Sequence, residues 1–497
     1  MQYQDLYFGM SDARNEAISH NDEFVRSYID QRGTIENVLY GNKFLVLGPK
    51  GTGKSAIAWY LRLTESNATH FADVLDASSL PLADIPRLQT GQEAGPERTV
   101  IAWRFILLCN YLQLLLRSGI AYIESDKEVK RVAKLLRDYG FMSDASGRAL
   151  TNISSTTITI PVPKIGEIYK REQRSNLNIY NLTPYLESWA VSALANVRHV
   201  LLLDGLDSIL LNDPKYDESL ASLVQAAYTL NQRFLEHDSC GSIVLLMRND
   251  VFARIGLSLP DSQKMRDDLS IQLDWRILSG AAGIRSPLMS LVNKKAAHAS
   301  GAADIDVLKF FPRDITLGTR AKRPRKTEIF PYLLNLTRHT PRDLLRLFEE
   351  IRKVAEAQGS GSGDAILSDE VIREGVLKYS KDYFVGAIGN EFAGVEGGPK
   401  QASAAISALK HLGKQEFDRA DFKKALDELG LDETPNDGRL LEMLFYAGAL
   451  GNVIGVRNER YMQFYHRRDD SEIYLNGKFI LANPLVHAWA IPFGRGE

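Results

Sequence analysis

The chain has 497 residues, of which 44% are hydrophobic, and its formal net charge is −2. A chain of this length suggests about three domains with ample apolar material for a core. The near-neutral charge excludes a polycation that binds nucleic acid through its overall field. Two cysteines, Cys109 and Cys240, exclude a disulfide framework and a Cys-x-x-Cys metal site.

The first residues carry no targeting signal that the sequence makes visible. Residues 1–20 are charged and lack an apolar core, unlike a secretion signal. Residues 1–40 are predicted to form an N-terminal arm with aromatic and charged positions at helical spacing. Within it, Tyr7 and Phe8 either pack on the core or cover the base of a nucleotide bound by the segment that follows.

The strongest signal is the run Gly48-x-x-x-x-Gly53-Lys54-Ser55, directly after the apolar residues Phe44 to Leu47. This is a Walker A phosphate loop. Its glycines allow a tight curl whose backbone N–H groups point at phosphate oxygens, and the helix that begins near Lys54 adds its positive dipole. Lys54 would reach the β and γ phosphates, and the Ser55 hydroxyl would ligate Mg²⁺. We therefore predict an ATP site formed by Gly48, Pro49, Lys50, Gly51, Thr52, Gly53, Lys54, Ser55 and Ala56.

Residues 41–295 are predicted to form the ATPase core, with an insertion at about 120–180. The most apolar stretch of the core, Val100 to Leu116, is interrupted by three polar residues and is predicted to be a buried helix rather than a membrane span. In the insertion we expect a charged helix over Asp126 to Tyr139. A β-branched run, Thr151 to Ile160, is expected to pair with Val162 to Ile168. We therefore expect a cytoplasmic protein that makes no membrane contact.

A second motif lies at residues 199–207, His-Val-Leu-Leu-Leu-Asp-Gly-Leu-Asp. The apolar run predicts a strand buried on both faces, and Asp204 follows at its carboxyl end, where it would hold the Mg²⁺. Many ATPases of this type have a glutamate next, which polarises the attacking water. Here Gly205 occupies that position. Asp207 either takes that role or caps a helix, and hydrolysis is otherwise slow.

Two further strands are predicted for the core. The run from Ser242 to Met247 ends at Arg248, which either senses the γ-phosphate or forms a salt bridge with Asp250 or Asp204. The alternating segment from Leu269 to Trp275 is predicted to lie nearer the edge of the sheet.

Residues 296–357 are predicted to form a helical lid. A basic stretch, Arg320 to Lys326, lies in an expected loop and either contacts phosphates or is simply solvated. Pro341 suits the first turn of a helix, which places Arg342 near the start of that helix. Arg342 is then either a sensor of the γ-phosphate or an ordinary surface arginine. Residues 358–366, rich in Gly and Ser, are predicted to be a flexible linker.

Residues 367–497 have a different pattern. Helical periodicity covers Lys400 to His411, Asp418 to Leu429 and Asp437 to Ala447, and a hairpin over residues 450–466 follows. Three helices followed by a hairpin is the plan of a winged helix. The hairpin's aromatic and basic residues, from Arg460 to Arg468, favour a DNA-contacting wing, whereas Asp469 and Asp470 oppose it. A protein–protein role is the open alternative.

Taken together, the Walker A loop, the Asp-Gly-Leu-Asp ending, Arg248 and the segment His339-Thr-Pro-Arg342 resemble the signal-transducing (STAND) branch of AAA-type ATPases. Origin-recognition ATPases share this plan, and the Tyr-Phe-Gly opening resembles a group of bacterial P-loop ATPases. The resemblance implies a switch: ATP closes the lid, subunits assemble into a homo-oligomer, and hydrolysis resets them. The effector and repeat-built sensor domains common in that branch are missing, which points to a partner protein.

The sequence therefore predicts an α/β fold: a P-loop NTPase parallel sheet with a helical lid and a C-terminal winged-helix domain. The leading hypothesis is a slow, Mg²⁺-dependent ATPase that acts as a molecular switch with a partner protein, with bacterial stress or phage defence as the setting implied by resemblance. The alternative is a DNA-binding ATPase of the origin-recognition or loader kind. Its proposed contacts with DNA are the wing and the basic stretch.

Overall fold

The computed structural model describes residues 2–65, 69–77, 96–123, 126–138, 141–142, 160–161, 176–177, 179–206, 214–276, 286–302, 305–317, 325–359, 366–392, 397–431, 436–456, 459–467 and 471–492. The chain divides into two compact units. We call residues 30–273 the sheet unit. We call residues 1–29 together with 274–497 the helical unit. The finer division into arm, core, lid, linker and winged helix stays a prediction.

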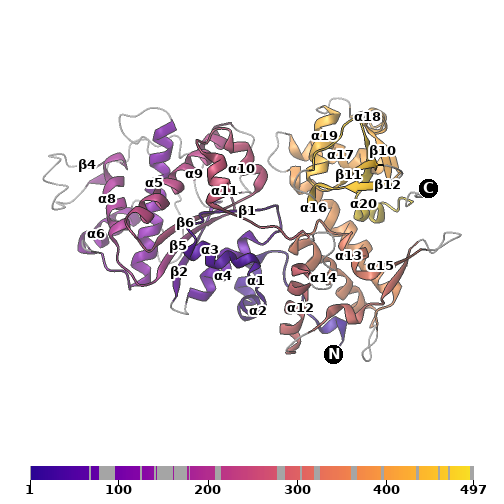
Figure 1. Ribbon diagram of the computed structural model, residues 1–497, viewed down its shortest axis with the longest axis horizontal. Coiled ribbons are helices and arrows are strands. Elements are labelled where there is room, and N and C mark those ends of the chain that lie inside the picture. The colour runs from indigo at the N-terminus through magenta and orange to yellow at the C-terminus, as the bar shows by residue number, and fades with distance from the viewer. Residues whose placement is uncertain are drawn as a thin grey trace. The chain divides into compact units, whose positions relative to one another are not determined.

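A five-stranded parallel sheet forms the centre of the sheet unit (Figure 1). The strands lie in the order β2-β5-β6-β1-β7. Their bounds are Leu45–Leu47 for β1, His70–Asp76 for β2, Arg198–Asp204 for β5, Gly241–Met247 for β6 and Ser270–Gln272 for β7. The predicted P-loop α/β fold is thus confirmed, and β7 lies at the edge of the sheet as expected.

Helices cover both faces of this sheet, so its central strands are apolar throughout. On one face, α4 (Lys54–Thr64) packs against β2, β5 and β6. On the other face lie α5 (Pro96–Ser118) and α9 (Pro214–Glu236), which pack on β5 and β6 respectively (Figure 1). Side chains alternate between the faces. Leu201 and Leu203 join the core with α5 and α9, and Val200, Leu202 and Asp204 therefore share the face of α4.

The helix α5 has the length and apolar composition that a membrane span requires, over Thr99–Ser118. Its side chains from Ala102 to Leu112 are nevertheless mostly fully buried inside the sheet unit, where α5 packs against α8 (Ile179–Ser192) and α9. It is therefore the core helix that the sequence predicted. Arg104 lies on its partly buried side and forms a salt bridge with Glu187 of α8.

The remaining elements of the sheet unit are short or peripheral. The predicted charged helix is confirmed as α6 (Asp126–Asp138). Two-residue strands β3 and β4 pair at Ile160 and Leu177, whereas the predicted hairpin over 151–168 lies largely outside the described residues. The other elements are η2 (Gln31–Gly33), α3 (Thr34–Tyr40), α10 (Asn249–Gly256) and α11 (Ser262–Asp268).

The N-terminal residues belong to the helical unit rather than to the sheet unit. Tyr3 and Phe8 are buried in the core of the helical unit, and the Tyr3 hydroxyl donates to the Phe348 carbonyl at 3.0 Å. Lys295 also forms a buried ion pair with Glu16, at 2.7 Å. Of the two readings of Phe8, packing is therefore confirmed. The elements of this part are η1 (Tyr3–Asp5), α1 (Ala13–Ser19), α2 (Asn21–Ser27), α12 (Pro287–Ser300), η7 (Val307–Phe310), β8 (Asp314–Leu317), β9 (Arg325–Glu328), α13 (Ile329–Leu334) and α14 (Pro341–Ala357).

The C-terminal part continues the same hydrophobic core. The three predicted helices are present as α17 (Gly398–Leu412), α18 (Arg419–Glu428) and α19 (Asp437–Tyr446). The predicted hairpin is formed by β11 (Leu450–Val456) and β12 (Glu459–Gln463). The strand β13 (Lys478–Leu481) and the helix α20 (Asn483–Ala488) follow it. With β10 (Glu416–Asp418), the strands form an antiparallel sheet in the order β10-β13-β11-β12. Whether this assembly acts as a winged helix stays a prediction.

A buried polar network joins α14 to the helix that follows it. That second helix runs through α15 (Asp369–Lys378), the π-helical turn η8 (Tyr379–Phe384), α16 (Val385–Gly389) and the 3₁₀ turn η9 (Asn390–Phe392). The fully buried Asp343 accepts hydrogen bonds from Arg338 and, at 2.7 Å, from the Tyr383 hydroxyl. Burial raises the pKa of Asp343, but the Arg338 charge and these hydrogen bonds outweigh burial and hold the pKa below its usual range.

We expect Tyr383→Phe to lower the free energy of unfolding by about 1–3 kcal/mol, because it removes a hydrogen bond to a buried carboxylate. The matched control is Tyr379→Phe in the same π-helical turn. The Tyr379 hydroxyl is buried and has no hydrogen-bond partner in the described part of the chain, so its loss should be neutral or stabilising. Chemical denaturation monitored by circular dichroism measures both. Equal effects of the two variants would contradict the role given to Asp343.

Candidate nucleotide site

The phosphate loop begins where β1 ends and curls directly into α4. Gly51 and Gly53 adopt positive φ angles of 82° and 96°, which glycine populates readily and other residues rarely do. The Thr52 hydroxyl donates to the Pro49 carbonyl at 2.8 Å and fixes the curl from inside. The loop therefore has the backbone shape that a phosphate-binding nest requires.

Lys54, the first residue of α4, is buried, with 6% of its surface exposed. Its ammonium group donates to the carbonyl oxygens of Gly48 and Pro49 at 3.0 and 3.1 Å. Two of its acceptors are thus backbone carbonyl oxygens of the loop. Carbonyl oxygens bind an ammonium less strongly than phosphate oxygens do, so an incoming phosphate could take over these contacts.

Asp204 lies at the same edge of the sheet as the loop. Parallel pairing sets Leu203 beside Leu245, and Leu47 beside Met247. The carboxyl ends of β5 and β1 therefore flank the end of β6, about 10 Å apart across two strand spacings. Asp204 also shares the sheet face with α4, whose first residues are Lys54 and Ser55. The structure brings these three predicted residues to one edge and one face.

One of the predicted catalytic residues, Asp207, cannot be placed at this edge. Asp207 lies outside the described residues, so its role stays a prediction. Gly205, the residue directly after Asp204, adopts a φ of 80°. A glutamate in that position would be strained, which gives a physical reason for the absence of a glutamate directly after Asp204.

Arg248 follows β6 at the same edge, between the ends of β1 and β5. Its guanidinium forms two hydrogen bonds with the exposed Asp250 carboxylate, at 2.8 and 2.7 Å. The salt bridge that the sequence gave as the alternative is therefore present. The Arg248 side chain is only 11% exposed, so this pair also fixes where the guanidinium lies. That Arg248 senses the γ-phosphate stays a prediction.

Arg342 lies in the helical unit, in the first turn of α14, as Pro341 predicted. Its Nε donates to the carbonyl of Ser11 at 3.0 Å. The next residue, Asp343, is the buried centre of the polar network described above. The turn that carries Arg342 is therefore held from both the N-terminal segment and the π-helical turn.

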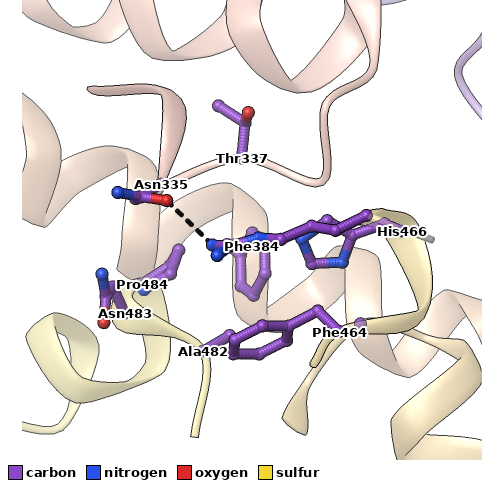
Figure 2. A pocket seen from close by; sticks show the side chains of 10 residues that line it. Asn335, Thr337, Phe384, Phe464, His466, Ala482, Asn483 and Pro484 are labelled. Atoms are coloured by element: carbon purple, nitrogen blue, oxygen red, sulfur yellow. Dashed lines mark hydrogen bonds between the residues drawn. The ribbon is translucent and has the colours of Figure 1, made fainter. Parts of the chain in front are cut away.

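Of the residues predicted to form a DNA-contacting wing, Phe464 is buried in the helical unit, whereas Arg460 and Tyr461 are exposed. Phe464 is 5% exposed, and Arg467 lies over its ring with 4.8 Å between the guanidinium carbon and the ring centroid. Arg467 also donates to Asn335 at 2.9 Å across a pocket that His466 helps to line (Figure 2). Phe464 therefore packs in the unit's own core with Arg467 over its ring, and the choice between a DNA-contacting wing and a protein–protein role stays a prediction. Arg460, which is exposed, forms a salt bridge with Glu416.

The predicted basic loop, Arg320 to Lys326, overlaps a strand in the structure. Its last two residues, Arg325 and Lys326, belong to the strand β9, which pairs with β8. Residues 320–324 lie outside the described part of the chain. The stretch is thus partly strand rather than wholly loop.

Sequence reasoning missed Asp76, the last residue of β2. Parallel pairing sets Asp76 directly beside Asp204. Both are partly buried and share the α4 face of the sheet. The signal was present as an aspartate closing a possible strand, but the mixed residues His-Phe-Ala-Asp-Val-Leu before it gave no clear pattern.

The donors near the loop suit a magnesium ion. Mg²⁺ prefers a few carboxylate or hydroxyl oxygens and completes its shell with water and phosphate oxygens. Ser55 and Asp204 supply such a pair. Within the described ranges, no cluster of three or more His, Cys, Asp or Glu residues could hold a metal alone. This donor set therefore fits an ion that arrives with a nucleotide.

No family model matches the sequence, and no curated protein matches it. Among solved structures, the chain is similar to the ORC2 protein of Aeropyrum pernix in its ADP form, with 13% identity and a TM-score of 0.33, covering 91% of this chain and 95% of that one. A Walker-type ATPase of Pyrococcus abyssi gives 12% identity and a TM-score of 0.35, over 96% and 97% of the two chains. Drosophila ORC bound to DNA gives 12% identity and a TM-score of 0.24, over 95% and 86%. Likeness at this level carries no argument about function.

We expect Gly48→Ala to weaken binding of a fluorescent ATP analogue by about tenfold or more, because a distorted loop misaligns several N–H donors at once. A β-carbon at Gly48 would lie 2.7 Å from the Thr52 hydroxyl and 3.0 Å from Leu273 Cβ. The control is Gly256→Ala, whose β-carbon would meet only ordinary contacts at 3.6 Å. Fluorescence titration measures both, and unchanged binding by Gly48→Ala would contradict the loop assignment.

Proposed function

We propose that the protein binds ATP with Mg²⁺ at the phosphate loop and hydrolyses it slowly. One observation carries the proposal: Lys54 and Ser55 at the start of α4 share a sheet edge and face with Asp204. In this proposal Lys54 stabilises charge on the β and γ phosphates. Ser55 and Asp204 hold the Mg²⁺, which would neutralise phosphate charge when bound. Gly51, Gly53 and their neighbours cradle the phosphates with backbone N–H groups.

We further propose that hydrolysis drives a molecular switch. Arg248 and Arg342 would report the γ-phosphate, and Arg342 would do so from the first turn of α14. The support for Arg342 is its fixed position between Ser11 and the buried Asp343 network. Nucleotide-gated self-assembly and action through a partner protein belong to this proposal. A setting in bacterial stress or phage defence rests on the resemblance alone.

The site assignment is tested by Lys54→Ala. We expect the ATP affinity to fall by about tenfold to a hundredfold, or turnover to be lost, because a charge-assisted contact contributes about 1.5–3 kcal/mol. Lys264→Ala, on the exposed side of α11, is the matched control. Calorimetric titration and phosphate release measure affinity and turnover. A Lys54→Ala protein that binds and hydrolyses ATP as the parent does would exclude this site.

The switch is tested by the size of the particle. We expect assembly with a non-hydrolysable ATP analogue and Mg²⁺, and no assembly with ADP, since ADP lacks the γ-phosphate that the two arginines report in this proposal. Light scattering after size exclusion measures the mass, and each sample is repeated with duplex DNA. Assembly only on DNA would favour the loader instead, and an identical mass in all samples would contradict the switch.

A further inference from the structure

Asp76 and Asp204 form a carboxylate pair at the nucleotide edge of the sheet. The register joins them directly, because Val74 pairs with Leu202 and Asp76 with Asp204. Neighbouring parallel strands lie about 4.8 Å apart, and directly paired residues point to the same face. That face is the one that α4 covers, with contacts to both β2 and β5. Both carboxylates thus lie on the side of the sheet where the phosphate loop enters its helix.

Two ionised carboxylates this close repel each other, so each lowers the other's tendency to ionise. Their positions relative to the loop differ. The strand order puts β5 two strands from β1, and β2 three strands from it. Asp204 is therefore the nearer of the two to Lys54 and Ser55, and Asp76 lies one strand farther out. The two carboxylates thus lie at different distances from the loop.

No glutamate follows Asp204, although many ATPases of this type have one at that position. Gly205 follows Asp204 with a φ of 80°, a conformation that a glutamate side chain disfavours. The strand that bears Asp204 thus offers no carboxylate at the next residue. The neighbouring strand β2 carries a carboxylate, that of Asp76, in register with Asp204.

We propose that Asp76 is the general base that orients and deprotonates the attacking water. This inference rests on the proposed ATPase function. The water oxygen forms a bond to the γ-phosphorus while the bond from that phosphorus to the β–γ bridging oxygen breaks. The bridging oxygen leaves with its electron pair on ADP. The proton of the water passes to the Asp76 carboxylate and then to solvent, so ATP and water give ADP, phosphate and one proton.

The test is Asp76→Asn in the full chain, which keeps the shape of the side chain and removes its basicity. We expect kcat to fall by about a hundredfold or more, as for other general bases. The affinities for Mg-ADP and for a non-hydrolysable Mg-ATP analogue should stay within about twofold of the parent, because Asp76 does not hold the nucleotide. Binding of ADP with aluminium fluoride, which mimics the phosphoryl group in transfer, should weaken about tenfold or more, because the mimic places the attacking water.

The matched control is Asp73→Asn. Asp73 lies on the same strand, three residues earlier, pairs with Leu201 rather than with Asp204, and forms a partly exposed ion pair with Arg62 at 3.6 Å. Its turnover and its affinity for the aluminium fluoride complex should equal those of the parent. This comparison separates the position of the carboxylate from a general loss of charge on β2.

The possible outcomes separate the two proposals. If the parent binds ATP and turns it over, and Asp76→Asn does so equally fast, the base assignment is wrong and the ATPase proposal stands. A hundredfold loss in Asp207→Asn with none in Asp76→Asn would assign the base to Asp207. Loss of Mg-nucleotide affinity in Asp76→Asn would make it a ligand of the ion and overturn the base role. A parent without any nucleotide affinity would remove the proposed function itself.

Discussion

The parallel register of the sheet is the constraint on which the candidate site depends. The carboxyl ends of parallel strands meet at one edge, so residues that follow β1, β6, β5 and β2 converge although the sequence separates them by up to about 200 positions. The apolar side chains of β5 and β6 are buried on both faces and hold this register. A slip of one residue in β2 would turn Asp76 to the opposite face and break the pair with Asp204.

Backbone conformation decides which chemistry that edge can carry. Gly51 and Gly53 allow the curl that turns N–H groups toward a phosphate, and Gly205 turns the chain away after Asp204. The positive φ of Gly205 therefore disfavours a glutamate at the position where many ATPases of this type have a catalytic one. A base must then come from another strand or from farther along the chain, and Asp76 on β2 satisfies the first condition.

The sequence allowed the phosphate loop, Asp204 and the buried strands to be predicted because each has a local pattern: a glycine spacing or an unbroken apolar run. The helices α6, α17, α18 and α19 were predictable from their periodicity. The pairing of Asp76 with Asp204 was not, because register between strands more than 100 residues apart leaves no local trace. The burial of Phe464 was missed for a related reason: an aromatic and basic run has the same pattern whether a given side chain faces solvent or the protein's own core.

The place where the chain leaves the sheet unit links the loop to the helical unit covalently. The Leu273 N–H donates to the Leu47 carbonyl at 2.8 Å, and Leu47 is the last residue of β1 before the loop. A β-carbon at Gly48 would also contact Leu273. The helical unit resumes at Asp274, which accepts three hydrogen bonds from Arg276. The end of β1, directly before the loop, is thus hydrogen-bonded to the last residue of the sheet unit before the chain crosses to the helical unit.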